Sequence, residues 1–411
     1  MLIPAVAMML LSVSACDSGI QKGTIDDVLA AIPAGASAET MSWQRVGDVC
    51  DLGGEAGDLF GRVCRLKAED PVVLVHPSDG AEVLVSAISD VAVAEDATAD
   101  WERVDLGRDG IAGRVCVADG GTVILGGRLV WLVPAASEVS AAVHAVSAIL
   151  DAGGGLPQPV RATLKPKSGI AVVLSIDDKY ITATVSAADD RVEVRGELRD
   201  SAGTVYDFGE YAQPIGGAIC DRPVCAAVAV GLRRGALARA VSKHLQPRLG
   251  VKEKLAFAAA SDILREVCGT LRATLEMEGD VAVVRVSMPY AEGGAVAATR
   301  RVSSMIRRVG QQNTVRAEAV GDSLMRLKIA VGERPPLFGG LAPMPTIAPD
   351  KDAFMALAIA PVLEGIVHLD GVEAVVYQRS FVITLHGTDL RRLSMMARGE
   401  DDDADDEQSD E

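Results

Sequence analysis

The arrangement of apolar residues after Pro134 constrains the fold more than any other feature of the chain. Stretches with helical spacing alternate there with pairs of short β-branched runs, and only a few turn residues separate the two runs of a pair. Strands joined by such short turns pair antiparallel. The pattern therefore predicts an α+β fold with antiparallel sheets, helices packed on one face, and repeated helix–hairpin units.

Four segments show this order. The first has an apolar helical stripe at Val139, Val143, Val146 and Leu150, followed by strands at 170–176, 180–185 and 191–198. The other three are predicted as a helix and two strands each: a helix at 255–271 with strands at 272–277 and 281–288, a helix at 294–310 with strands at 315–320 and 324–331, and a helix at 352–366 with strands at 371–376 and 381–386.

The chain before Pro134 is predicted to be β-rich, with runs at 72–76, 81–88, 111–118 and 122–133 after a short helix at 25–32. Residues 43–46 and 61–64 recur in similar form at 101–104 and 113–116, through either an old duplication or chance. A chain of 411 residues holds two or three domains. We expect a signal peptide at 1–15, a tether and short helix at 16–35, a β-rich N-terminal domain at 36–133, an α–β meander at 134–215, a C-terminal domain at 216–395 and a disordered acidic tail at 396–411.

Residues 1–15 form an uncharged apolar run that ends in Val13-Ser14-Ala15-Cys16. This ending resembles the lipobox of bacterial lipoproteins, which implies cleavage before Cys16, lipidation of that cysteine and attachment to a membrane of the cell envelope, facing the periplasm or the surface. The alternative is a buried helix with an incidental cysteine. The helix–hairpin order also loosely resembles uncharacterised lipoprotein families of Gram-negative bacteria, which imply no known activity.

Six cysteines remain after Cys16, and an even number in an exported chain favours disulfides. Cys220 and Cys225 flank a turn-forming Asp-Arg-Pro-Val segment and are the first candidate pair. Cys50 and Cys64 flank a Gly/Asp-rich segment and are the second. Cys116 and Cys268 then either pair with each other or stay as buried thiols.

Charge excludes one class of partner. The net charge is −17, so phosphate backbones are repelled and nucleic acid is not an expected partner. Aromatic residues make up only 3%, which argues against platforms that stack bases or sugars. The acidic tail should be solvated, and its nine acidic residues are Glu400, Asp401, Asp402, Asp403, Asp405, Asp406, Glu407, Asp410 and Glu411.

The predicted helix at 294–310 has a basic face opposite an apolar one. The apolar face holds Val302, Met305, Ile306 and Val309, and the basic face holds Arg300, Arg301, Arg307 and Arg308. Such a helix packs on a core with its basic face in solvent, or lies on a membrane surface. The acidic tail is a third candidate for the neighbour of this face.

No catalytic residue, metal site or cofactor is predicted. Gly321-Asp322-Ser323-Leu324 resembles the signature of GDSL hydrolases, in which the serine is the nucleophile, but the other blocks of that family do not follow it. A β-turn between two strands is the simpler interpretation. The five histidines, His76, His144, His244, His368 and His386, show no metal-ligand spacing.

The sequence thus favours a non-catalytic, membrane-anchored lipoprotein that acts as a scaffold or binds an envelope protein partner. The first alternative is a carrier or sensor of a hydrophobic ligand or lipid, because helices over an antiparallel sheet can enclose an apolar site. The second is a serine hydrolase that uses Ser323.

Overall fold

Antiparallel pairing dominates the computed structural model, in which every strand register runs antiparallel across the residues it describes. The mixed, β-rich α+β class is therefore confirmed. The chain divides into an N-terminal unit, Met1–Ser186 with Leu198–Val205, and a C-terminal unit, Ala187–Glu197 with Tyr206–Glu411. The structure describes residues 20–49, 54–78, 80–107, 111–152, 155–165, 169–176, 178–188, 191–210, 212–216, 219, 224–244, 261–279, 281–308, 310–311, 313–333, 352–359 and 371–386.

Within the described residues, nine strands make up the sheet of the N-terminal unit. Their spatial order is β4 (Glu102–Leu106), β5 (Ile111–Ala118), β6 (Gly121–Gly126), β7 (Leu129–Pro134), β3 (Val83–Ala87), β2 (Pro71–His76), β1 (Ser37–Ser42), β8 (Ile170–Ile176) and β9 (Lys179–Ala188). The run predicted as one strand at 122–133 is the β6–β7 hairpin, which turns at Gly127 with a positive φ of 58°.

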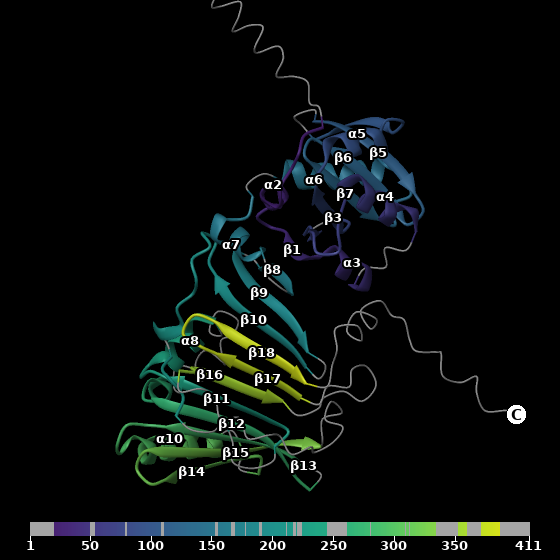
Figure 1. The fold of residues 1–411 in the computed structure, drawn as a ribbon. Coiled ribbons are helices and arrows are strands. Elements are labelled where there is room, and N and C mark those ends of the chain that lie inside the picture. Colours follow the sequence, from purple (N-terminus) through teal and green to yellow (C-terminus); the bar gives the residue numbers. More distant parts are fainter. Residues whose placement is uncertain are drawn as a thin grey trace, which may run out of the picture. The chain divides into compact units, whose positions relative to one another are not determined.

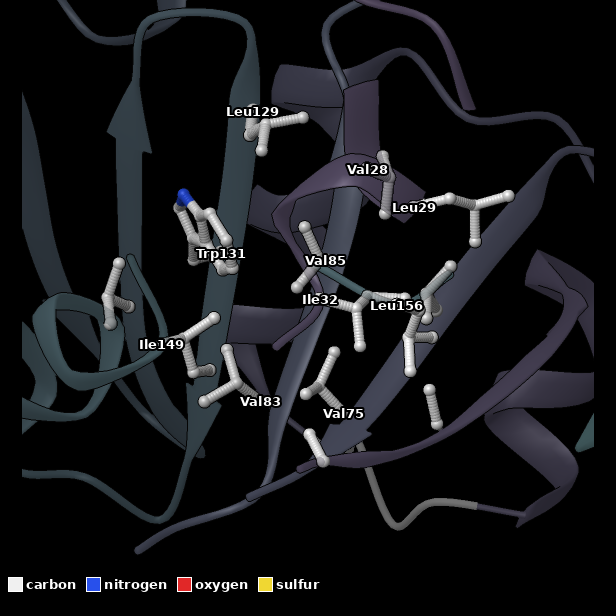
Figure 2. Packing of buried hydrophobic residues seen from close by; sticks show 14 of the residues in the cluster. Val28, Leu29, Ile32, Val75, Val83, Val85, Leu129, Trp131, Ile149 and Leu156 are labelled. Atoms are coloured by element: carbon white, nitrogen blue, oxygen red, sulfur yellow. The ribbon is translucent and has the colours of Figure 1, made fainter. Parts of the chain in front are cut away.

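Helices α2 (Ile25–Ala31), α6 (Val139–Asp151) and α7 (Gln158–Thr163) contribute to the main core of this unit. Figure 2 shows residues of this core from the helices and strands, with Ile149 of α6 near Trp131 and Leu29 of α2 on the other side of Val85. Helices α3 (Trp43–Val49), α4 (Glu55–Cys64) and α5 (Val91–Ala97) complete the unit. Consecutive residues of β2 and β6 are buried, so the sheet is covered on both faces at these strands rather than on one.

Two sequence expectations fail in the N-terminal unit. Residues 61–64 lie in α4, whereas their sequence counterparts at 113–116 lie in β5. The recurring motifs therefore do not form a structural repeat. Helix α4 also replaces much of the loop expected before Cys64, because its residues Phe60 and Val63 supply an apolar stripe that is fully buried.

The strands described for the C-terminal unit also form one antiparallel sheet (Figure 1). Their order is β10 (Arg191–Arg199), β18 (Phe381–His386), β17 (Gly371–Val376), β16 (Met355–Ile359), β11 (Ala226–Leu232), β12 (Gly269–Glu278), β13 (Val281–Pro289), β15 (Leu324–Glu333) and β14 (Val315–Val320). A short 3-10 helix, η2, spans Phe208–Glu210.

Helices α8 (Ala236–His244) and α10 (Gly294–Arg308) belong to a core cluster that includes strand residues of β11, β12, β13 and β15. Within the described residues, no helix is both long and apolar enough to cross a membrane. The predicted order of a helix at 294–310 and strands at 315–320 and 324–331 matches α10, β14 and β15 closely.

The regular helix–hairpin repeat is not confirmed. The helix predicted at 352–366 is wrong, because Met355–Ile359 is strand β16, held between β11 and β17. Ladders on both sides outweigh the weak helix preference of the Met-Ala-Leu-Ala run. The helix predicted at 255–271 extends too far, since β12 already begins at Gly269, whose φ of 105° suits glycine.

Candidate hydrophobic binding surface

Strand β16 buries its small side chains and leaves its large ones partly open. Ala356 and Ala358 are 0% and 2% exposed, whereas Met355, Leu357 and Ile359 are only half-buried. Strand β11 repeats this inversion, with Ala227 and Ala229 buried and valines between them half-buried. Burying a larger apolar side chain gains more free energy, so a fold normally turns its large residues inward.

A loop explains why the small residues are buried. Ile215, Ile219 and Val224 pack against the alanines of β11 and β16 in one cluster. The loop lies so close that a Cβ on Gly231 would be 1.8 Å from the carbonyl oxygen of Gln213. Only small side chains fit under this loop, and the large side chains of these strands lie on the other face.

The residues on this other face form three rows across β10, β18, β17, β16 and β11. Because paired residues of neighbouring strands share a face, the registers align these rows directly. We call this set the apolar surface, and its rows are Val192–Leu385–Val372–Ile359–Ala226, Val194–Ile383–Ala374–Leu357–Val228 and Gly196–Phe381–Val376–Met355–Val230.

The apolar surface is wide enough to hold an extended hydrophobic molecule. Five strands span about 19 Å, and the distance from the first row to the third is about 13 Å along a strand. Apart from Val192 and Gly196, which are buried, its members are half-buried. Of these members, only Val230 is assigned to the helical core cluster.

Polar side chains of the same strands lie on the opposite face. Glu373 of β17 and His386 of β18 lie close together there, with 3.5 Å between the glutamate Oε1 and the imidazole Nε2. Glu193 of β10 pairs with Arg195, and the pKa of Glu193 is lowered chiefly by its hydrogen bond from Arg195. The apolar surface itself carries no polar side chain, so it can bind by contact area but offers no group for proton transfer.

A second apolar area lies on β8 of the N-terminal unit. Leu174 and Ile176 are 41% and 50% exposed, unusually high values for such large apolar residues in a strand. Nearby, His76 of β2 has its Nδ1 2.9 Å from Glu82 and its Nε2 3.6 Å from Glu39 of β1. The Glu39 carboxylate, with help from Glu82, raises the pKa of His76.

Comparisons with protein-family models, curated proteins and solved structures found no match for this chain. The candidate surface therefore stands on its geometry alone.

Three of the cysteines named in the predictions, Cys16, Cys50 and Cys220, lie outside the described residues. No disulfide joins any two of the four cysteines that the structure does describe. Cys64 is fully buried and burial raises the pKa of its thiol, while Cys225 is buried next to β11. Cys116 and Cys268 are half-buried free thiols, so of the two alternatives left open for them the structure shows thiols rather than a pair.

The basic face of the predicted helix is present on α10. Arg300, Arg301, Arg307 and Arg308 are all exposed, and the Nε of Arg307 donates to the carbonyl oxygen of Ser303 at 3.3 Å. Val302 and Met305 pack against the core of the unit, as expected for a core-packed helix. Val309 lies outside the described residues.

The Gly-Asp-Ser-Leu motif forms the turn between β14 and β15. Gly321 has a φ of 64°, and the Ser323 carbonyl oxygen accepts a hydrogen bond from the Tyr290 amide at 2.7 Å. His144 is exposed on α6, and His244 is the last residue of α8. His368 lies outside the described residues.

Proposed function

We propose that this protein is a membrane-anchored, non-catalytic component of the cell envelope that binds a hydrophobic ligand on its C-terminal sheet. The observation that carries the proposal is the inverted burial of β11 and β16, where the large apolar side chains are the more open ones. The lipobox ending at Cys16 supports the anchor and the location.

A lipid acyl chain fits the chemistry of the apolar surface. Each methylene removed from water contributes about 0.8 kcal/mol, so a chain lying across several strands gains substantial binding free energy without a polar contact. Recognition by area alone discriminates weakly between chain lengths. We therefore expect a carrier or sensor of apolar molecules with broad selectivity.

Native mass spectrometry of residues 17–411, purified from an oxidising periplasm, tests this proposal. We expect a co-purifying mass that dissociates as a lipid. Ile383→Asn places an amide in the middle row of the apolar surface and should remove that mass. Val382→Asn makes the same kind of change on the neighbouring residue, which faces the other side, and should retain it.

Two results would contradict ligand binding. One is a bare protein that also fails to enhance the fluorescence of an apolar dye. The other is equal loss of the lipid in both asparagine variants, which would point to general destabilisation rather than a binding surface.

The second apolar area, formed by Leu174 and Ile176 of β8, favours a second function, the binding of an envelope protein partner. Leu174 and Ile176 are large apolar side chains exposed to solvent, and exposed apolar side chains of this kind are typical of contact surfaces. Chemical crosslinking in intact envelopes should yield a stoichiometric adduct that Leu174→Ser with Ile176→Ser abolishes. Val117→Ser, at a residue 45% exposed on β5, is the matched control and should leave the adduct unchanged. An adduct that survives the double substitution would argue against this surface.

A further inference from the structure

Helix α10 presents a basic surface with no acidic residue of its own. Its residues Val302 and Met305 are directed to the core, while four arginines on the outer side are exposed. Within the described part of the chain, no salt bridge joins Arg300, Arg301 or Arg308 to a carboxylate. Four guanidinium groups in 15 residues of helix, with none of these three paired, form a surface suited to a multivalent anion.

We propose that the occupant of this surface is the acidic segment at 400–411 of the same chain. This segment holds nine carboxylates and no basic residue, so it complements the four arginines in charge. A guanidinium group donates two parallel hydrogen bonds to one carboxylate, and this bidentate geometry favours the pairing over a diffuse ion atmosphere. The remainder of the chain offers no comparable run of acidic residues.

The topology allows the segment to reach the helix. A single register row runs from Leu385 near the end of β18 to Val315 at the start of β14. Seven strand spacings separate these two residues, or about 34 Å. Helix α10 ends at Arg308, shortly before Val315, and packs on β14 and β15 (Figure 1).

The chain between His386 and Glu400 is long enough for this distance. Fourteen residues span at most about 48 Å when extended. A tether of this length also keeps the acidic segment at an effective concentration near the millimolar range, far above that of a competing anion in free solution. Weak individual ion pairs can therefore add up to a stable intramolecular contact.

Arginine modification followed by peptide mass mapping tests the contact directly. Phenylglyoxal reacts with accessible guanidinium groups, and the exposed Arg103 of β4 serves as the internal reference. In the full chain at low salt, Arg300, Arg301 and Arg308 should react about threefold more slowly than Arg103, since several weak ion pairs protect them. Exchange of the nine acidic residues for their amides should remove the protection, as should 0.5 M NaCl, where the screening length is only about 4 Å.

Equal reaction rates in the native and amide-substituted chains would overturn the proposal. So would protection that appears only on adding vesicles containing phosphatidylglycerol and is equal in both chains, because the occupant would then be a membrane surface. The amide substitutions change none of the residues in the described strands and helices. An unchanged midpoint of chemical unfolding for the substituted chain will confirm that altered rates report the contact.

Discussion

Ala356 and Leu357 are consecutive residues of β16 that face opposite sides of the sheet, and the alanine is the one that is buried. The alanine lies beneath the loop that carries Ile215, whereas the leucine belongs to the middle row of the apolar surface. A fold that needed only a core would place these two residues the other way round. This relationship links the packing of the unit to the proposed ligand.

Truncation of Leu357 should therefore cost little. We expect Leu357→Ala to lower the free energy of unfolding by about 1 kcal/mol, against 2–5 kcal/mol for truncation of a fully buried residue of similar size. Met325→Ala, at a residue with no exposure in the same unit, is the buried reference. Chemical denaturation measures both, and equal losses would show that Leu357 is buried in solution.

Enlarging the neighbouring alanine should, in contrast, destabilise the fold and leave ligand binding intact. Ala356→Leu adds volume under the covering loop, and overpacking of this kind costs about 1–3 kcal/mol. The variant should unfold more easily and yet retain the lipid expected in native mass spectrometry, because the apolar surface is untouched. An Ala356→Leu protein with unchanged stability would mean that the loop does not press on this face.

Gly231 should be the most sensitive glycine of the covered face. A Cβ there would meet the backbone oxygen of Gln213 at 1.8 Å, which only a shift of the loop can relieve. We expect Gly231→Ala to cost about 3 kcal/mol in unfolding free energy. Gly279→Ala is the control, because that turn residue has open space around it and a φ of 63°, so only backbone strain of about 1 kcal/mol applies. Similar losses in the two variants would refute the close approach.

The part of the fold with local signals was predictable from sequence. The hairpin at 371–376 and 381–386 was predicted with the bounds that the structure shows, because two β-branched runs flank a short polar turn. The turn at Gly321 was predictable for the same reason. Strand β16 was not, since Met355-Ala-Leu-Ala-Ile also suits a helix and only its neighbours β11 and β17 decide the outcome.

The candidate surface was missed for a related reason. Large residues alternate with alanine in β16 and in much of β11, and this period of two is visible in the sequence. The alternation does not say which face is covered, because that depends on a loop around Ile215 that packs on the sheet from elsewhere in the chain. The sequence therefore predicts which residues share a face of the sheet, but it does not predict which of the two faces is buried.

The disulfide predictions can be tested by alkylation under denaturing, non-reducing conditions. Denaturation is needed because burial raises the pKa of the Cys64 thiol and would protect it from the reagent even if it were free. The structure gives Cys64, Cys116 and Cys268 as free thiols, so we expect all three to be alkylated without reductant. The candidate pair Cys220–Cys225 should react only after reduction, and its alkylation without reductant would refute that pair and weaken the assignment to an oxidising compartment.

His76 should make the stability of the N-terminal unit depend on pH. Glu39 and Glu82 raise its pKa above the ordinary value of 6.5, so its charged form stabilises the folded state. That contribution is fully present below the unfolded pKa and is lost as pH rises through the higher folded value. Because the imidazole is partly exposed, we expect this contribution to be about 0.5–1 kcal/mol.

Unfolding free energies of the native chain and of His76→Gln, measured at pH 5.5 and 8.5, test this expectation. The native chain should be the more stable of the two at pH 5.5, and the two values should converge at pH 8.5. His144→Gln, at an exposed helix position, is the matched control for the loss of an imidazole. A constant offset between the native chain and His76→Gln would mean that packing, rather than charge, stabilises this position.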